Sequence, residues 1–114
     1  MPETFGERVR RIRQERGMGL RDTARRVGVS ATFLSRIETG AEQATPREDV
    51  IRKLAEALGD DFDHLMQLAG RIPSEVKDVV QTDPQMPEFL RRVKERNIPA
   101  AQLMRWLDGE KDKS

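Results

Sequence analysis

The sequence contains no cysteine, no tyrosine, one tryptophan and one histidine among its 114 residues. Without cysteine the chain can form no disulfide, hold no iron–sulfur cluster or thiolate zinc site, and use no cysteine nucleophile. The single histidine, His64, leaves little for acid–base or metal chemistry. We therefore expect a chain that binds no metal and no cofactor, and a binding module rather than an enzyme.

Long apolar runs are also missing. No stretch approaches the roughly 18 apolar residues that a membrane-spanning helix requires. The segment Met1-Pro2-Glu3 does not have the basic and then apolar character of a secretory signal. These absences predict a cytoplasmic protein that does not contact a membrane.

Charge is segregated along the chain, although the net charge is only +1. Residues 1–40 carry nine arginines and five acidic residues, whereas residues 41–70 carry three basic and seven acidic residues. A basic segment of this kind is typical of a polyanion-binding face, but a solvated helix surface gives the same count. Charge by itself therefore favours a nucleic-acid ligand without deciding for it.

Apolar residues recur at helical spacing throughout, and strand signals are absent, which predicts an all-α fold. Glycine residues separate the predicted helices in the first part of the chain. The helices expected there run from Phe5 to Gly17, from Leu20 to Val27, from an N-cap at Ser30 to Gly40, from an N-cap at Thr45 to Gly59, and from an N-cap at Asp61 to Gly70. In the fourth, Thr45-Pro46-Arg47-Glu48 has the pattern of a capping box with proline at the first helical position.

Proline replaces glycine as the punctuation after Gly70. Three short helices are expected near residues 73–81, 86–96 and 99–108, and residues 109–114 are expected to fray. The predicted organisation is a five-helix domain at residues 1–70 followed by a helical segment of two or three helices at residues 71–114.

Two short helices joined by a glycine turn form the most informative part of the sequence, residues 20–39. Ala24 is small, so the second helix can cross close over the first, and Gly28 can make the turn between them. Leu34 and Ile37 can anchor the second helix. This is the construction of a helix-turn-helix, whose second helix projects side chains into the major groove of DNA. Any corner between two helices needs similar residues, so the pattern is only moderately specific.

The surrounding residues add to this pattern. The string RVRRIRQERGMGLRDTARRVGVSATFLSRIETG, followed by Pro46 and VIRKLAEALG, resembles the Cro/C1-type (xenobiotic-response-element, XRE) helix-turn-helix family over about residues 5–69. The resemblance implies a five-helix, lambda-repressor-like fold that binds DNA, and a partly buried ion pair between Arg13 and Glu38. Two positions depart from the family: Gly19 replaces the usual Ser or Thr cap, and Thr23 replaces an apolar residue.

Candidate DNA contacts follow from this assignment. In the groove, Arg36 can donate two hydrogen bonds to guanine, Thr32 can use its hydroxyl or methyl group, and Ala31 can contact a thymine methyl. Backbone N–H groups around Arg21 can hold a phosphate, and Arg47, expected in a first helical turn, is poorly placed unless an anion approaches. A solvated helix surface is the alternative for each, and core packing is the alternative for Phe33. The full set is Leu20, Arg21, Ala31, Thr32, Phe33, Ser35, Arg36, Gln43 and Arg47.

The C-terminal segment is similar to the helical hairpin of Sin-type repressors, a resemblance that implies dimerisation or binding of a small protein antagonist. Its apolar side chains exceed what a two-helix hairpin can bury, which predicts a homodimer. The alternative is that this segment folds back onto the fifth helix. The predicted dimerisation residues are Phe89, Leu90, Val93, Leu103, Met104, Trp106 and Leu107.

Taken together, these patterns predict a sequence-specific DNA-binding transcriptional regulator, acting as a repressor and as a dimer on a two-fold-related operator. Two alternatives remain open. The chain could be the antitoxin of a toxin–antitoxin pair, with a toxin bound to its C-terminal segment. It could also be a protein–protein adaptor without DNA binding, although the basic segment and Arg36 argue against this.

Overall fold

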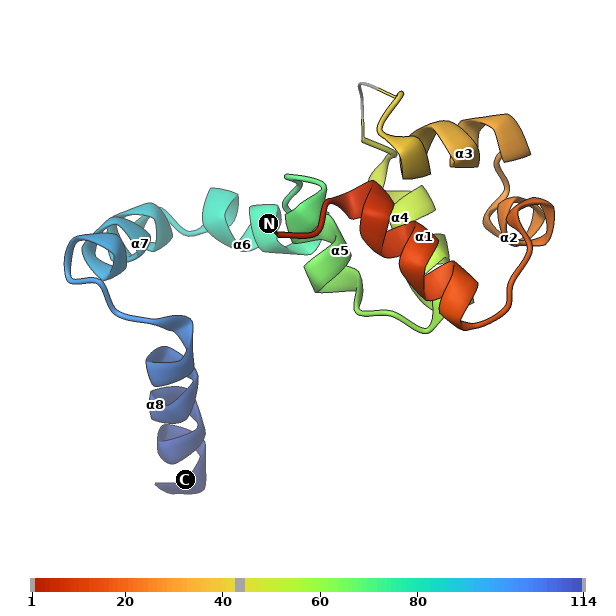
Figure 1. The fold of residues 1–114 in the computed structure, drawn as a ribbon. Coiled ribbons are helices and arrows are strands. Elements are labelled where there is room, and N and C mark those ends of the chain that lie inside the picture. The colour runs from red at the N-terminus through yellow and green to blue at the C-terminus, as the bar shows by residue number, and fades with distance from the viewer. Residues whose placement is uncertain (1, 43–44, 114) are drawn as a thin grey trace. The chain divides into compact units, whose positions relative to one another are not determined.

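The computed structural model describes residues 2–42 and 45–113, the last four of these by backbone alone. Over these residues the chain forms helices and no strand, which confirms the predicted all-α fold (Figure 1). It divides into two compact units, the head (Met1–Pro73) and the tail (Ser74–Ser114). The helices are α1 (Phe5–Glu15), α2 (Leu20–Val27), α3 (Ala31–Thr39), α4 (Glu48–Leu58), α5 (Phe62–Leu68), α6 (Ser74–Thr82), α7 (Gln85–Glu95) and α8 (Ala100–Lys113).

Short-range hydrogen bonds set most helix boundaries of the head. The side chains of Ser30 and Asp61 accept bonds from backbone N–H groups in the first turns of α3 and α5. Gly28, Gly40 and Gly59 end α2, α3 and α4 in the left-handed conformation that glycine adopts without steric cost. These caps and stops lie where the sequence predicts them.

The start of α4 differs from the expected capping box. The helix begins at Glu48, its N-cap is Arg47, and no side chain caps it. Thr45 lies before the helix, and its hydroxyl and carbonyl oxygens accept hydrogen bonds from the Arg71 guanidinium at 3.1 and 3.0 Å. The prediction was wrong because a distant arginine takes the oxygen atoms that the local pattern assigns to the helix.

The end of α8 is also a correction. The sequence predicts fraying from residue 109 onward, yet the helix runs through Gly109 to Lys113. The φ angle of Gly109 is not positive, so this glycine does not end the helix in the left-handed conformation. Glutamate and lysine, which are good helix formers, then continue it.

The hydrophobic core described in the structure belongs to the head. Helix α1 packs on α3 and α4, α2 packs on α3 and α4, and α5 packs on α4. The buried apolar residues are Phe5, Val9, Ile12, Ala24, Val27, Leu34, Ile37, Ile51, Leu54, Ala55, Leu58, Leu65, Met66 and Ala69.

One close approach between helices depends on glycine. A Cβ atom at Gly6 of α1 would overlap with the carbonyl oxygen of Ile37 in α3. Gly6 therefore lets the two backbones touch, and this contact fixes where α3 lies on the head.

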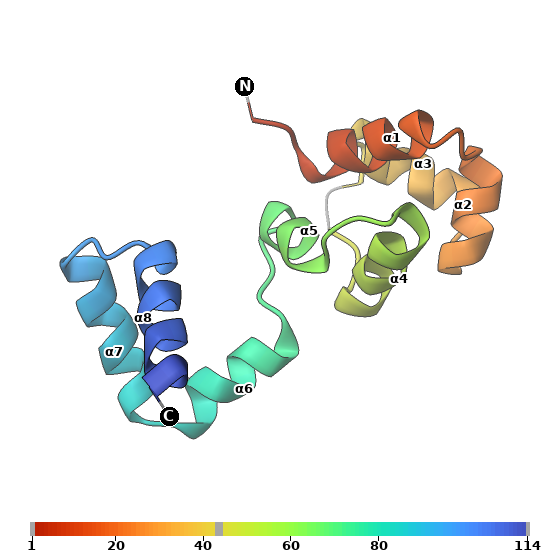
Figure 2. The same ribbon diagram turned by 90° about the horizontal axis from the view of Figure 1, so that it is seen from below.

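The tail has a different character from the head. Neither α6 nor α7 contains a buried residue. Helices α7 and α8 are joined by a short turn (Figure 2), and a groove beside this turn is lined by Phe89, Arg92 and Val93 of α7, Arg96 and Ile98 of the turn, and Leu103 of α8. Across the described part of the chain, no helix combines the length and apolar character needed to cross a bilayer.

Candidate nucleic-acid interface

Helices α2 and α3 meet at the corner that the sequence predicts. Ala24 is buried at 2% exposure, and its carbonyl oxygen accepts hydrogen bonds from the N–H groups of Gly28 and Val29 at 2.9 and 3.0 Å. Leu34 and Ile37 are buried and hold α3 in place. The buried side of α3 is therefore fixed on the head, and no other helix of the head covers its opposite side (Figure 1).

The outward side of α3 carries the predicted base-reading residues. Thr32 and Arg36, one turn apart, are both exposed, and Ala31 and Ser35 are half-buried beside them. Phe33 is also half-buried and packs against the core. This is the core packing that the sequence analysis gave as the alternative to a DNA contact. A helix with one buried side and a polar outer side of this kind can enter a major groove.

Arg36 has a neighbour that the sequence analysis did not single out. Its Nε atom lies 3.3 Å from Oε2 of Glu42, which follows α3. The N–H of Glu42 also donates a hydrogen bond to the carbonyl oxygen of Arg36 at 3.1 Å. Arg36 lies before the glycine that ends α3 and Glu42 lies after it, so helical periodicity does not relate their positions. The sequence pattern therefore gave no indication of this pair.

The start of α2 is the predicted phosphate-binding end. Gly19 is its N-cap and supplies no side-chain hydrogen bond. The hydroxyl of Thr23, fully buried, instead donates to the Gly19 carbonyl oxygen at 2.9 Å. Leu20 is half-buried against the core and Arg21 is exposed. This bond satisfies the buried hydroxyl of Thr23 but supplies no acceptor in place of the missing side-chain cap, so the N–H groups of the first turn remain available to an anion.

Two further candidate contacts follow α3. Arg47 is the N-cap of α4 and not part of its first turn; its side chain is 80% exposed and lies 3.5 Å from the Asp49 carboxylate. Gln43 lies outside the described residues.

The family of the chain follows from comparison with known proteins. Residues 4–69, more than half of the chain, match the family model described as a helix-turn-helix domain. The chain belongs to this helix-turn-helix family. The matched residues are α1 to α5 with the loops between them, so the geometry just described is that of a helix-turn-helix domain.

Curated relatives are named as transcriptional regulators. The chain is 44% identical over 70 residues to the HTH-type transcriptional repressor RghR of Bacillus subtilis (strain 168), a match covering 61% of this chain and 51% of RghR. It is 31% identical over 98 residues to the regulator DdrOP3 of Deinococcus deserti, covering 75% of this chain and 74% of that protein. The match thus spans about half the length of RghR.

A solved structure extends the likeness in fold to the tail. A chain of a structure titled SinR protein/SinI protein complex superposes with a TM-score of 0.52 at 22% identity, covering 96% of this chain and 97% of that one. At this identity the likeness concerns the fold. The relatives are named as HTH-type transcriptional regulators, and the head of this chain is a helix-turn-helix domain.

An ion pair supports the position of α3 in this helix-turn-helix domain. Arg13 of α1 donates to both carboxylate oxygens of Glu38 at 2.8 and 2.9 Å, and to the Met18 carbonyl oxygen at 2.9 Å. Glu38 is buried and Arg13 is 12% exposed in its side chain. The ion pair that the family resemblance implies is therefore confirmed, and Glu38 faces away from the predicted DNA side.

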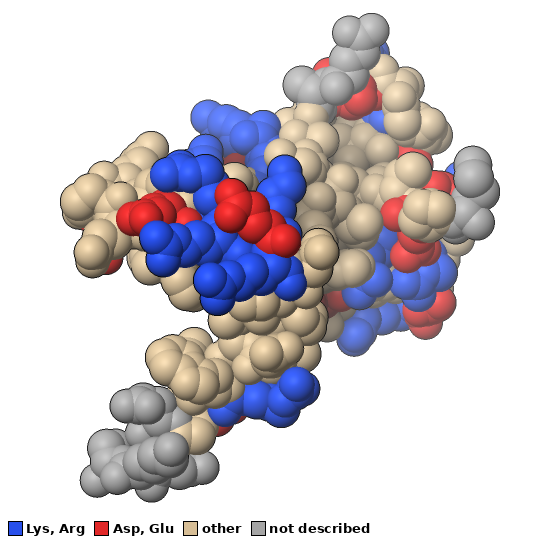
Figure 3. Space-filling model, turned by 90° about the vertical axis from the view of Figure 1, so that its left-hand side faces the viewer, with Lys and Arg blue, Asp and Glu red and all other residues tan. Residues whose placement is uncertain are grey.

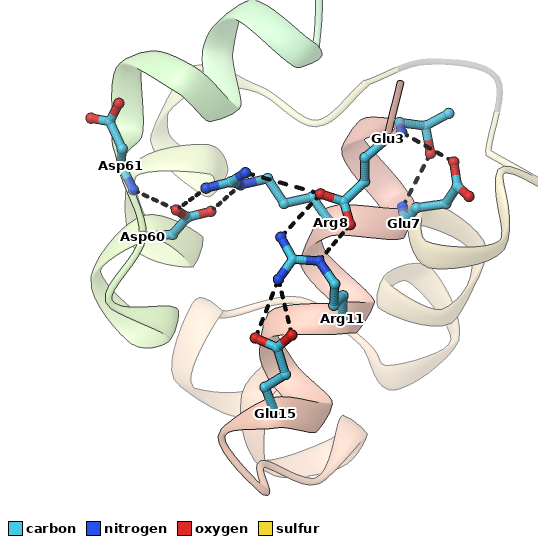
Figure 4. Close-up of polar contacts among 8 residues, drawn as sticks. Glu3, Glu7, Arg8, Arg11, Glu15, Asp60 and Asp61 are labelled. Atoms are coloured by element: carbon cyan, nitrogen blue, oxygen red, sulfur yellow. Dashed lines mark hydrogen bonds and ion pairs between the residues drawn. The ribbon is translucent and has the colours of Figure 1, made fainter. Parts of the chain in front are cut away.

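A second ion pair joins α1 to the α4–α5 loop of the helix-turn-helix domain (Figure 4). Arg8 donates to both carboxylate oxygens of Asp60 at 2.7 Å, and this guanidinium lowers the pKa of Asp60 below its ordinary value. Arg11, more exposed, bridges Glu3 and Glu15 on the surface. Arg8 and Asp60 are far apart in sequence, so the spacing of residues along the chain does not predict this ion pair.

The predicted dimerisation residues lie on α7 and α8. Five are exposed by 45% or more of their area: Phe89, Leu90, Met104, Trp106 and Leu107. Val93 and Leu103 are half-buried in the groove beside the turn that joins the helices. Basic side chains also gather on the part of the tail that carries α7 (Figure 3), where the exposed cations are Arg91, Arg92, Lys94 and Arg96. The tail therefore presents an unburied apolar surface beside a basic one.

Proposed function

We propose that this protein is a transcriptional repressor that binds a two-fold-related DNA operator as a homodimer and occludes a promoter. The observation that carries the proposal is the outward side of α3, where Thr32 and Arg36 are exposed on a helix held from behind by Leu34, Ile37 and Glu38. The relative RghR is named as a transcriptional repressor, which supports repression rather than activation as the role of this protein. Because the ligand is chromosomal DNA, the proposal places the protein in the cytoplasm.

Each contact residue has a distinct role in this proposal. Arg36 donates to guanine O6 and N7, while Thr32, Ala31 and Ser35 contact neighbouring bases. The phosphate contacts come from the start of α2 and the region after α3, and they fix the register of the domain on the duplex without reading sequence. They are Leu20 and Arg21 through the first turn of α2, Gln43, and Arg47.

Dimer formation is part of the same proposal. A single helix-turn-helix domain makes too few contacts for tight and specific binding, so two half-sites are needed. The exposed apolar residues of α7 and α8 support pairing with a second copy, because such a surface is unfavourable in water. We extend the proposal to a protein antagonist that competes for this surface and thereby relieves repression. The similarity in fold to a chain from a complex of two proteins supports this extension.

Selection from a random duplex library tests the proposal directly. The selected sequences should contain two inverted half-sites separated by whole helical turns. Binding should weaken steeply as the salt concentration rises, because the arginines of the protein release counterions from the DNA phosphates when they bind. Arg36→Ala should cost about 1–3 kcal/mol and relax one base pair in each half-site. Arg21→Ala should weaken binding to all duplexes alike. An unchanged base preference in the Arg36 variant would contradict the assignment of α3 as the reading helix.

A further inference from the structure

Glu42 is held against the proposed base-reading arginine by two separate contacts. Its Oε2 atom lies 3.3 Å from Arg36 Nε. Its backbone N–H donates to the Arg36 carbonyl oxygen at 3.1 Å, beyond the Gly40 stop of α3. The Glu42 side chain is 26% exposed and that of Arg36 is 55% exposed. The backbone bond fixes the main chain of residue 42 next to the end of α3, within reach of Arg36 for its carboxylate.

We infer that Glu42 is a specificity-determining residue: it orients Arg36 toward a guanine edge and suppresses binding of Arg36 to phosphates. This inference rests on the proposed function, since it takes Arg36 as the base-reading side chain. Glu42 is a positioning residue in this scheme, because it acts through Arg36 and needs no contact of its own with DNA.

The first part of the inference comes from the position of the guanidinium. A guanidinium presents five N–H donors in a planar fork, and the Nε corner of the Arg36 guanidinium lies beside the Glu42 carboxylate in an ion pair. Neither terminal nitrogen makes a hydrogen bond with a described residue, and the shortest approach of Arg36 to Glu42 is at Nε. These nitrogens can still donate two parallel bonds to the O6 and N7 atoms of guanine. Because the pair with Glu42 already restricts the rotamers of Arg36, less side-chain entropy is lost when the base is bound.

The second part comes from charge. An unpaired arginine is attracted to any phosphate, which raises affinity for every duplex equally. Arg36 and Glu42 together carry no net charge, and a phosphate contact would bring a carboxylate close to the polyanion. A guanine edge supplies two acceptors without a full negative charge. Glu42 therefore weakens the binding of Arg36 to phosphates more than its binding to guanine. This difference in binding free energy makes the protein more specific for its operator.

A second acidic residue near the interface allows a matched control. Asp49 lies 3.5 Å from the exposed cation Arg47 and is 59% exposed. Among the described residues, Asp49 makes no hydrogen bond or ion pair with α3. Asp49→Asn and Glu42→Gln remove the same charge from the same region, but only Glu42→Gln releases Arg36.

The experiment measures dissociation constants of the full chain for the selected operator, for the operator with the Arg36 base pair replaced, and for a random duplex of equal length. Glu42→Gln should bind the random duplex more tightly and should lose roughly fivefold or more of its discrimination at the replaced base pair, the lower end of what one bidentate contact supplies. Asp49→Asn should tighten binding to all three duplexes by a similar factor and keep the discrimination.

Double substitution isolates the route through Arg36. In an Arg36→Ala background, Glu42→Gln should no longer change discrimination at that base pair, because the residue it positions is gone. The inference is overturned if Glu42→Gln behaves like Asp49→Asn, or if its effect on discrimination persists without Arg36. Failure of the proposed function looks different: the unmodified protein would then bind duplexes without preference, or Arg36→Ala alone would leave base preference intact. Thermal unfolding of each variant shows that the head is folded in every comparison.

Discussion

Arg13 and Glu38 join α1 to α3 through a bidentate ion pair with N–O distances of 2.8 and 2.9 Å. Both side chains are largely withdrawn from water, at 12% and 4% exposure. The remaining Arg13 nitrogen donates to the Met18 carbonyl oxygen, so each of the three guanidinium nitrogens makes a hydrogen bond. The pair lies on the inner side of the reading helix, which allows stability and base reading to be tested separately.

Glu38→Gln should lower the free energy of unfolding of the head by roughly 3 kcal/mol, because it leaves a largely buried guanidinium without its counter-charge. The measurement is urea denaturation at neutral pH. The control is Glu15→Gln, which removes an exposed partner of Arg11 and should cost less than about 1 kcal/mol. Base preference well below the melting temperature should not change; a new consensus with unchanged stability would place Glu38 in the reading site.

Asp60 should make the head less stable in acid. Its pKa is lowered by hydrogen bonds from Arg8, so the folded state binds a proton less readily than the unfolded state does. The stabilisation is therefore complete above the ordinary carboxyl pKa, near 4, and disappears as the pH falls through the lowered value. Asp60→Asn should cost about 1–3 kcal/mol at pH 7 and should flatten the decline in acid. A decline of the same steepness in the variant would remove Asp60 as its cause.

Gly6→Ala should destabilise the head although alanine favours helices. The added Cβ would overlap with the Ile37 carbonyl oxygen, which is backbone and cannot move aside cheaply. We expect a net loss of about 1–3 kcal/mol in thermal or urea unfolding. Gly109→Ala in α8 is the matched control, since nothing lies within 4 Å of its Cβ position, and it should leave stability unchanged or higher by up to about 1 kcal/mol. Equal behaviour of the two variants would disprove the close approach of α1 to α3.

Leu103→Asp should convert a dimer into a monomer. Leu103 is half-buried in the groove that it lines with Phe89, Val93 and Ile98, and a carboxylate in its place opposes this apolar contact and the pairing of two copies. The control Gln102→Asp adds the same charge at an exposed neighbouring position and should remain dimeric. Sedimentation at tens of micromolar distinguishes the two. The Leu103 variant should bind the operator weakly yet keep a folded head, whose core contains no residue of the tail. Sedimentation of the unmodified protein as a monomer would refute the homodimer and favour a docking site for another protein.

The sequence by itself determined most of the local structure of the head. Ser30, Asp61 and Gly28 act through hydrogen bonds and backbone angles that involve at most a few neighbouring residues, so their effect on helix ends can be inferred without a fold. The periodic spacing of residues such as Leu34 and Ile37 likewise identified the buried side of α3 and, by exclusion, its outer side.

Only the tertiary structure decided which distant groups meet. Thr45 carries the signature of a helix cap, but Arg71 approaches from 26 residues away and binds its oxygen atoms, so the helix starts later. Asp60 pairs with Arg8 across 52 residues, and Glu42 reaches Arg36 across a glycine stop. Local propensity depends on the nearest few residues, whereas these contacts depend on how whole helices pack, and packing is a property of the complete core.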